Sequence, residues 1–129
     1  MKRKFVLIVL ALVLAFGAVS VVNAKVINAS ITTNRTSNTS ATITASADFD
    51  GTKDSCTCKI TLQEKYNGAW RKATSVSKKT ASVTKSDRAG ILFSTKFTLI
   101  KGKVYRVKVA FTDKKGSRTT TSTYYSGSF

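Results

Sequence analysis

The chain has 129 residues, of which 22 are lysine or arginine, six are aspartate or glutamate and none is histidine, for a formal net charge of +16. Without histidine the chain lacks the usual general base of nucleophilic catalysis and the commonest metal ligand, so we expect no enzyme, no metal and no other cofactor. A charge of this size favours association with polyanions, among them cell-wall polymers, anionic lipid, nucleic acid and acidic sugars, without choosing among them.

The first residues predict export from the cell. Basic residues at 2–4 precede an apolar run at 5–22, which ends in the small-residue exit Val22-Asn23-Ala24 of a secretory signal helix. Cleavage after this triplet assigns 1–24 to a signal peptide and 25–129 to one domain of a secreted, extracellular protein. The alternative is an uncleaved anchor, because about 18 apolar residues nearly suffice to span a bilayer. Cleavage removes three of the 22 basic residues and none of the six acidic ones, leaving a charge of +13.

The rest of the chain alternates apolar and polar residues with a period of two, which is typical of half-buried strands. Turn signals stand at Asp50-Gly51, Asn67-Gly68, Lys101-Gly102 and Lys114-Lys115-Gly116. No segment has a convincing helical period, and no proline breaks a strand. In chain order the predicted strands are 25–32, 40–49, 56–65, 69–77, 90–99, 103–112 and 117–125.

Four of these strands have an apolar face that predicts the core. The expected inward residues are Ala41, Ile43, Ala45, Ala47 and Phe49; Cys56, Cys58, Ile60 and Leu62; Ile91, Phe93, Thr95, Phe97 and Leu99; and Tyr105, Val107, Val109 and Phe111. The segment 69–77 alternates less cleanly, because Lys72 and Thr74 separate Trp70 from Val76 on the same face. We therefore expect a bulge or an edge position there.

Seven short strands separated by turns predict an all-β, seven-stranded antiparallel two-sheet sandwich. The segment from Gly102 to Val109 resembles the F strand of immunoglobulin-like and fibronectin-III-like domains, with Tyr105 where a tyrosine often starts that strand. The resemblance covers the whole of 25–129 and departs from antibody domains, whose cysteines bridge two strands and whose tryptophan lies on strand C. The whole chain is also similar to short, basic, secreted sandwich proteins of Gram-positive bacteria.

Cys56 and Cys58 lie two residues apart, so both point to the same face of a strand. Their expected Cα separation of about 6.5–7 Å is at the upper limit for a disulfide. Three outcomes stay open: two reduced core thiols, a strained local disulfide and an intermolecular bridge. A zinc site would need about four ligands, and the chain has no histidine to complete one.

The acidic residues do not form a convincing site in the sequence. Asp48, Asp50 and Asp54 surround Gly51 in a way that superficially resembles a calcium loop, but the glycine and Lys53 occupy the wrong positions for one. A turn whose aspartates bond their own backbone is the simpler interpretation. A catalytic carboxylate pair would have to join separate loops, for example Asp50 with Asp87.

The basic residues, in contrast, concentrate on one predicted face. If strands 56–65 and 103–112 are neighbours, as in a fibronectin-III-like order, their outward positions place Lys59, Lys65, Arg106 and Lys108 together. The other sheet presents mainly serine and threonine, so charge is expected to be lopsided. No aromatic side chain is expected on the basic face, which argues against nucleic acid because bases would have nothing to stack on.

These features predict a non-catalytic secreted module that associates with an anionic surface, either a cell-wall polymer or lipid headgroups, through these four cations. One alternative is a structural or protein-interaction domain that pairs through an edge strand, most plausibly 69–77 or 117–125. Another is a secreted antimicrobial or toxin-like cationic protein that disrupts anionic membranes. Lysines that merely solubilise a sheet are the simplest explanation of the charge.

Overall fold

The computed structural model describes residues 26–129, so the predicted leader and its cleavage site lie outside the described residues. Strands make up 78% of the described chain and helix none, which confirms the all-β class. No helix within 26–129 is long and apolar enough to cross a membrane. The strands are β2 (Val26–Ser37), β3 (Ser40–Tyr66), β4 (Ala69–Lys72), β5 (Thr80–Thr98), β6 (Tyr105–Lys115) and β7 (Arg118–Tyr125).

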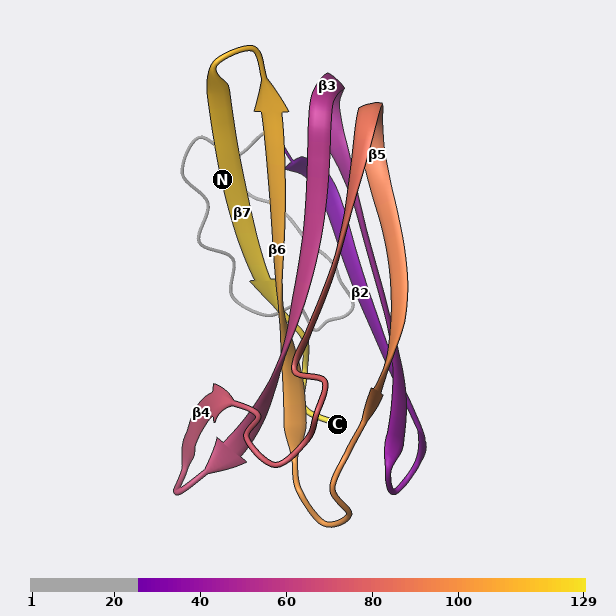
Figure 1. Cartoon of the computed structure of the whole chain (residues 1–129), viewed down its shortest axis with the longest axis vertical. Helices are drawn as coiled ribbons and strands as arrows, with labels where there is room; N and C mark the ends of the chain where they lie inside the picture. Colours follow the sequence, from indigo (N-terminus) through magenta and orange to yellow (C-terminus); the bar gives the residue numbers. More distant parts are fainter. Residues whose placement is uncertain (1–25) are drawn as a thin grey trace.

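The strands form one curled antiparallel sheet built around β3 (Figure 1). The first part of β3 pairs with β2 and with the second part of β5, from Ser40↔Thr98 to Asp48↔Gly90. The second part pairs with the first part of β5 and with β6, and β6 pairs with β7. The expected neighbourhood of 56–65 and 103–112 is therefore confirmed. Because two different sets of strands flank the two parts of β3, the inner face of the sheet encloses a core.

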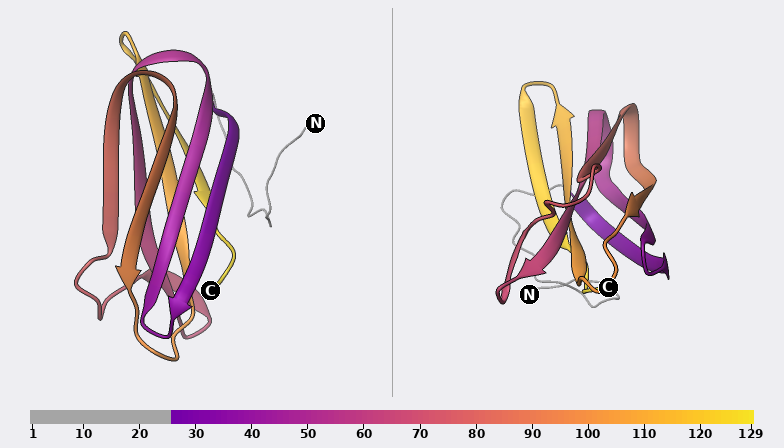
Figure 2. Two further views of the ribbon diagram at one scale, coloured as in Figure 1. Left: turned by 90° about the vertical axis from the view of Figure 1, so that its right-hand side faces the viewer. Right: turned by 60° about the horizontal axis from the view of Figure 1, so that its bottom comes forward.

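The signal Asp50-Gly51 does not end a strand. The ladder between β3 and β5 resumes at Lys53↔Arg88 after a register shift, and Figure 2 shows both strands arching over at the same end of the molecule. A bulge bends a strand and increases its twist without ending it. The predicted separate strands 40–49 and 56–65 are thus two parts of β3.

The other predicted turns are confirmed. Asn67 and Gly68 have φ values of 51° and 80°, the positive pair that a two-residue type I′ hairpin requires. Glycine takes positive φ without steric cost, and asparagine tolerates it better than most residues. This hairpin places Lys65 directly opposite Trp70.

Several strand boundaries differ from the prediction. β2 extends past residue 32 to Ser37, and β6 extends past residue 112 to Lys115. β4 is only four residues long and pairs with β3 alone, which confirms the edge position but not the length of 69–77. The first part of β5, residues 80–89, lies between the predicted strands 69–77 and 90–99 and belongs to neither. Its apolar alternation is limited to Ala81 and Val83. The segment is a strand because its main chain pairs with β3.

The predicted core is largely confirmed. All the expected inward residues of β3 and β6 are buried, and Ala41 and Ala45 lie directly opposite Phe97 and Phe93 of β5, small against large. Phe93 and Thr95 are only half-buried, whereas Ile91, Phe97 and Leu99 of the same face are buried. Ala73 joins the core from the segment after β4.

Candidate anion-binding site

The four predicted cations lie on the outward face of the sheet formed by the second part of β3, β6 and β7, which we call the basic face. Thr61 lies opposite Lys108 and Gln63 opposite Arg106 in the β3–β6 ladder, so these side chains share one face with Lys59 and Lys65. Lys59 and Lys65 are exposed, and Arg106 and Lys108 are half-buried. The strand order thus brings together all four residues.

No carboxylate shares this face among the described residues. Glu64 and Asp113 point inward and are buried, and Asp54, which accepts a hydrogen bond from the Gly116 amide, lies beside the bend in the middle of β3. The outward positions carry lysine, arginine, glutamine, serine and threonine instead, with Ala110 and Tyr125. The cations therefore have no counter-charge from their own face.

Arg106 is held in place on three sides. Its Nε donates to Gln63 Oε1 at 2.7 Å, and its guanidinium carbon lies 4.7 Å from the ring centroid of Trp70 and 4.4 Å from that of Tyr125. Trp70 belongs to β4 and Tyr125 to β7, so the two rings approach from opposite sides of β6. Both contacts are within the range of cation–π attraction.

The terminal nitrogens of Arg106 have no hydrogen-bond partner in residues 26–129. Partial burial lowers the pKa of Arg106, and the nearby Tyr125 offsets this only in part, yet a guanidinium stays protonated at neutral pH. The group is therefore a partly desolvated cation whose orientation is fixed and whose outer edge is free. Such an edge matches a carboxylate or phosphate, which can accept two parallel hydrogen bonds.

The aromatic rings contradict the expectation that this face has none. Trp70 lies opposite Lys65, whose Nζ is 5.5 Å from the ring centroid, and Tyr125 lies opposite Lys108. The Asn67-Gly68 hairpin signal was sufficient to pair Trp70 with Lys65. The basic face therefore has aromatic side chains on which bases could stack.

Hydroxyl side chains fill most of the remaining basic face. Thr57 and Thr84 hydrogen-bond across the β3–β5 ladder at 2.9 Å, and Thr112 and Thr121 do so across β6 and β7 at 3.0 Å. Because Thr57 also lies opposite Thr112, four threonines form a row across four strands. Cross-strand hydrogen bonds of this kind stabilise the sheet.

The opposite outward face, over β2, the first part of β3 and the second part of β5, is nearly neutral. Its charged side chains within 26–129 are Asp48 and Lys96, among serine, threonine and asparagine. Leu92 stands out on this face at 69% exposure. The predicted asymmetry of charge between the two faces is confirmed.

Cys56 and Cys58 are free thiols, and both are buried on the inner face of β3. Burial raises the pKa of the Cys58 thiol to about 12, so it stays protonated and unreactive at neutral pH. Cys56 Sγ donates to the Arg88 carbonyl at 3.6 Å. Both side chains act as small apolar groups of the core.

The aspartates near Gly51 point to different partners. Asp48 faces outward, Asp50 forms an ion pair with the buried Lys53 at 2.6 Å, and Asp54 accepts the Gly116 amide at 2.7 Å. In the described part of the chain, no group of three or more histidine, cysteine or acidic side chains is placed to hold a metal ion.

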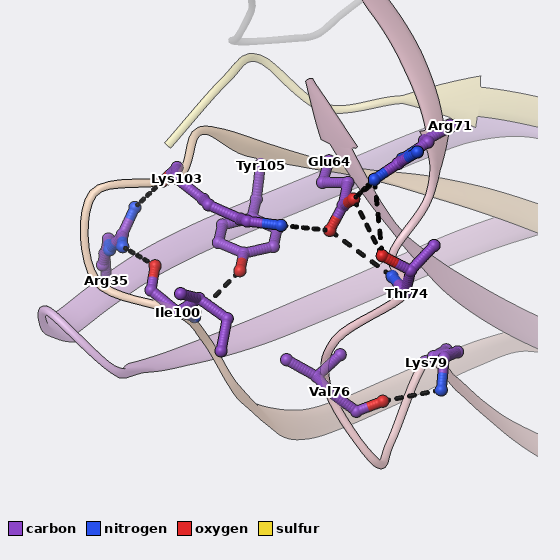
Figure 3. A network of polar contacts seen from close by, with 9 residues as sticks. All are labelled: Arg35, Glu64, Arg71, Thr74, Val76, Lys79, Ile100, Lys103 and Tyr105. Carbon is purple, nitrogen blue, oxygen red and sulfur yellow. Dashed lines mark hydrogen bonds and ion pairs between the residues drawn. The ribbon is translucent and has the colours of Figure 1, made fainter. Parts of the chain in front are cut away.

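Glu64, the sole glutamate of the chain, forms a buried polar network that the sequence did not reveal (Figure 3). Its carboxylate accepts from Arg71 Nε at 2.8 Å and from the Thr74 hydroxyl at 3.2 Å, and Lys103 Nζ lies 3.3 Å away. Burial alone would raise the pKa of Glu64, but these hydrogen bonds outweigh it and lower the pKa. The network fastens the loop after β4 and the loop before β6 to the end of β3.

Comparison with known proteins finds no matching family model, no curated relative and no matching solved structure. The geometry of the basic face therefore carries the functional argument that follows.

Proposed function

We propose that the protein is a non-catalytic, secreted module that associates with an anionic extracellular polymer or surface, such as a cell wall or lipid headgroups, through the basic face. The observation that carries this proposal is Arg106, whose free outer edge is oriented by Gln63, Trp70 and Tyr125 on a face without carboxylates. Lys65 and Lys108 lie near it on the same face and Lys59 lies further along β3, so together they extend the attraction to a polyanion.

The affinity of such a face should come largely from released counterions. The four cations project from two adjacent strands of a rigid sheet, so the spacing of their backbone positions is set before binding, and the guanidinium of Arg106 is oriented as well. An anionic ligand does not have to displace a carboxylate from this face. On a surface where lysine and arginine already form ion pairs, it would have to do so.

If the basic face binds the anion, removing its four cations should weaken binding more than removing four cations elsewhere on the protein. We expect the combined variant Lys59→Gln, Lys65→Gln, Arg106→Gln and Lys108→Gln to lose most of its binding to teichoic acid and to phosphatidylglycerol vesicles. Binding of the unmodified protein should fall steeply between about 50 and 200 mM salt, and the variant should show a shallower slope. Equilibrium binding measured at both salt concentrations tests this.

A matched control removes the same charge elsewhere. Lys85, Lys96, Lys101 and Lys115 are exposed, and none of their side-chain nitrogens has a hydrogen bond within 26–129. The combined change of these four to glutamine should retain most of the binding. Equal losses in both variants would show that only net charge matters and would contradict a specific face.

We also propose that the curled sheet is a fibronectin-III-like sandwich of Gram-positive type. In this assignment β2, the first part of β3 and the second part of β5 form one sheet, while the rest of β3 and β5 with β6 and β7 form the other. Support comes from Tyr105, whose phenolic oxygen accepts the Ile100 amide at 2.8 Å. A tyrosine at the start of strand F that bonds to the backbone just upstream is a hallmark of such sandwiches.

Replacing Tyr105 with phenylalanine should lower the free energy of unfolding by about 1–2 kcal/mol. The ring is fully buried, and the change leaves the Ile100 amide without its partner. Equilibrium urea unfolding measures the loss, with Tyr66→Phe as the control because Tyr66 is half exposed. A change below about 0.5 kcal/mol would show that the bond is not needed to hold this corner.

A protein-interaction role remains the second candidate because of β7. This strand pairs with β6 alone, and beyond Arg118 it carries no charged residue or proline to protect its free edge. An extended partner strand could add to it. Monomeric behaviour in sedimentation at high protein concentration would argue against pairing between copies.

A further inference from the structure

We propose that the ligand of the basic face is an acidic polysaccharide, whose pyranose rings pack against Trp70 and Tyr125 while an oxyanion group on the chain binds Arg106. This inference rests on the proposed function and narrows it from polyanions in general to one chemical class. The evidence for this class of ligand is the pair of aromatic rings, Trp70 and Tyr125, because a ligand recognised by its charge alone would need no aromatic contact.

The anion-binding half of the site is Arg106 with Lys65. The Nε bond to Gln63 leaves the two terminal nitrogens as the accessible donors, and both rings restrict the guanidinium from turning away. A carboxylate or phosphate that approaches in the guanidinium plane can therefore accept two bonds at once. Lys65, beside Trp70, adds a mobile charge for a second anionic group.

The ring-binding half consists of Trp70 and Tyr125, which are half-buried on an otherwise polar face. Aromatic side chains offer flat apolar area with a polar edge, which suits the C–H faces and hydroxyl rims of sugars. The row Thr80, Thr61, Lys108 and Tyr125 crosses four strands and places two hydroxyls, an ammonium and a phenol in line. Such a row can bond sugar hydroxyls along a chain that lies across the sheet.

The composition of the face favours a glycan over a nucleic acid. Hydroxyl side chains outnumber cationic ones on its outward positions, and they can hydrogen-bond the two free hydroxyls of each galacturonate unit, whereas a nucleotide within a chain has at most one. Arg106 and Lys65 lie over the rings, so a ligand group that contacts a ring also lies beside a cation. A sugar acid carries its carboxylate on the pyranose ring itself and can therefore contact the aromatic ring and the cation together, whereas the base of a nucleotide is separated from its phosphate by the sugar.

The test compares four probes at one low salt concentration: polygalacturonate, neutral dextran, polyphosphate and oligothymidylate. The unmodified protein should bind polygalacturonate about tenfold or more tightly than polyphosphate of equal charge, and dextran weakly. The double variant Trp70→Ala, Tyr125→Ala should lose this advantage: its binding to polygalacturonate should fall about tenfold more than its binding to polyphosphate, which loses only the ring-held orientation of Arg106. The double variant Trp70→Phe, Tyr125→Phe keeps both rings and should retain most of the advantage.

Circular dichroism and the urea midpoint establish that the variants fold, and Leu92→Ala on the opposite face serves as the matched apolar truncation. Equal binding of polygalacturonate and polyphosphate, unaffected by ring removal, would overturn this inference and leave the proposed function standing. Tightest binding of oligothymidylate with loss in the ring variants would overturn it in favour of single-stranded nucleic acid. Failure of both polyanions to bind would overturn the proposed function itself.

Discussion

Replacing Phe111 with alanine is expected to lower the free energy of unfolding by about 3–5 kcal/mol. Phe111 is fully buried on β6, lies between Cys58 of β3 and Ser122 of β7, and meets the Tyr124 ring edge-on with centroids 5.9 Å apart. Its neighbours are fixed by two ladders, so they cannot collapse into the space that the ring leaves. Equilibrium urea unfolding monitored by tryptophan fluorescence measures the change.

The matched control is Leu92→Ala. Leu92 is 69% exposed, so its truncation leaves no cavity and should change stability by less than about 0.5 kcal/mol. A loss below about 1 kcal/mol for Phe111→Ala would mean that the core between β3, β6 and β7 repacks freely. The expected loss is a large share of the stability of a domain this size, about 5–15 kcal/mol, so the variant should also unfold at a clearly lower temperature.

The alternation of apolar and polar residues was enough to predict this core. In β6 the buried set from Tyr105 to Phe111 follows the two-residue period without exception, because a strand turns each successive side chain to the other face. The same rule predicted the outward position of Arg106 and Lys108. Once Asn67 and Gly68 fix a hairpin, the local register also follows from geometry.

The features of the fold that the sequence did not predict depend on pairing between strands that lie far apart in the chain. Residues 80–89 become a strand because β3 pairs with them, and the ladder resumes beyond Asp50-Gly51, at Lys53↔Arg88, because β5 bends with β3. Neither fact has a signal in the local residues. The cooperative bend of two paired strands is a property of the sheet.

The candidate site also has residues that the sequence predicted and residues that it did not. Its four cations were predicted from the period of two, because each belongs to a strand with clear alternation. Of its aromatic rings, Tyr125 was missed because its contact with Arg106 depends on how β7 lies beside β6, whereas the Asn67-Gly68 hairpin was a sufficient signal to place Trp70 beside Lys65. Glu64 was missed for a related reason: a lone carboxylate among outward lysines gives no hint of the loops that bury it.

Replacing Glu64 with glutamine is expected to cost about 2–3 kcal/mol in the free energy of unfolding at neutral pH, because hydrogen bonds to a charged group are stronger than neutral ones. Glutamine has nearly the same shape, so the change tests charge rather than packing. It removes the counter-charge of Arg71 and Lys103, whose side chains remain partly exposed and regain some hydration. Urea unfolding at pH 7 measures the loss.

The pH dependence gives a sharper test, because the pKa of Glu64 is lowered in the folded protein. A carboxyl of this kind adds stability above its usual pKa of 4.5, and that contribution is lost as the pH falls through the folded value. The stability difference between the unmodified protein and Glu64→Gln should therefore be constant above about pH 6 and shrink steadily below about pH 5. Asp87→Asn is the matched control, because Asp87 is exposed and asparagine accepts its positive φ of 55°. A stability difference for Glu64→Gln that is the same at pH 3 and pH 7 would show that its charge does not stabilise the fold, and that the buried carboxylate serves only to position the two loops.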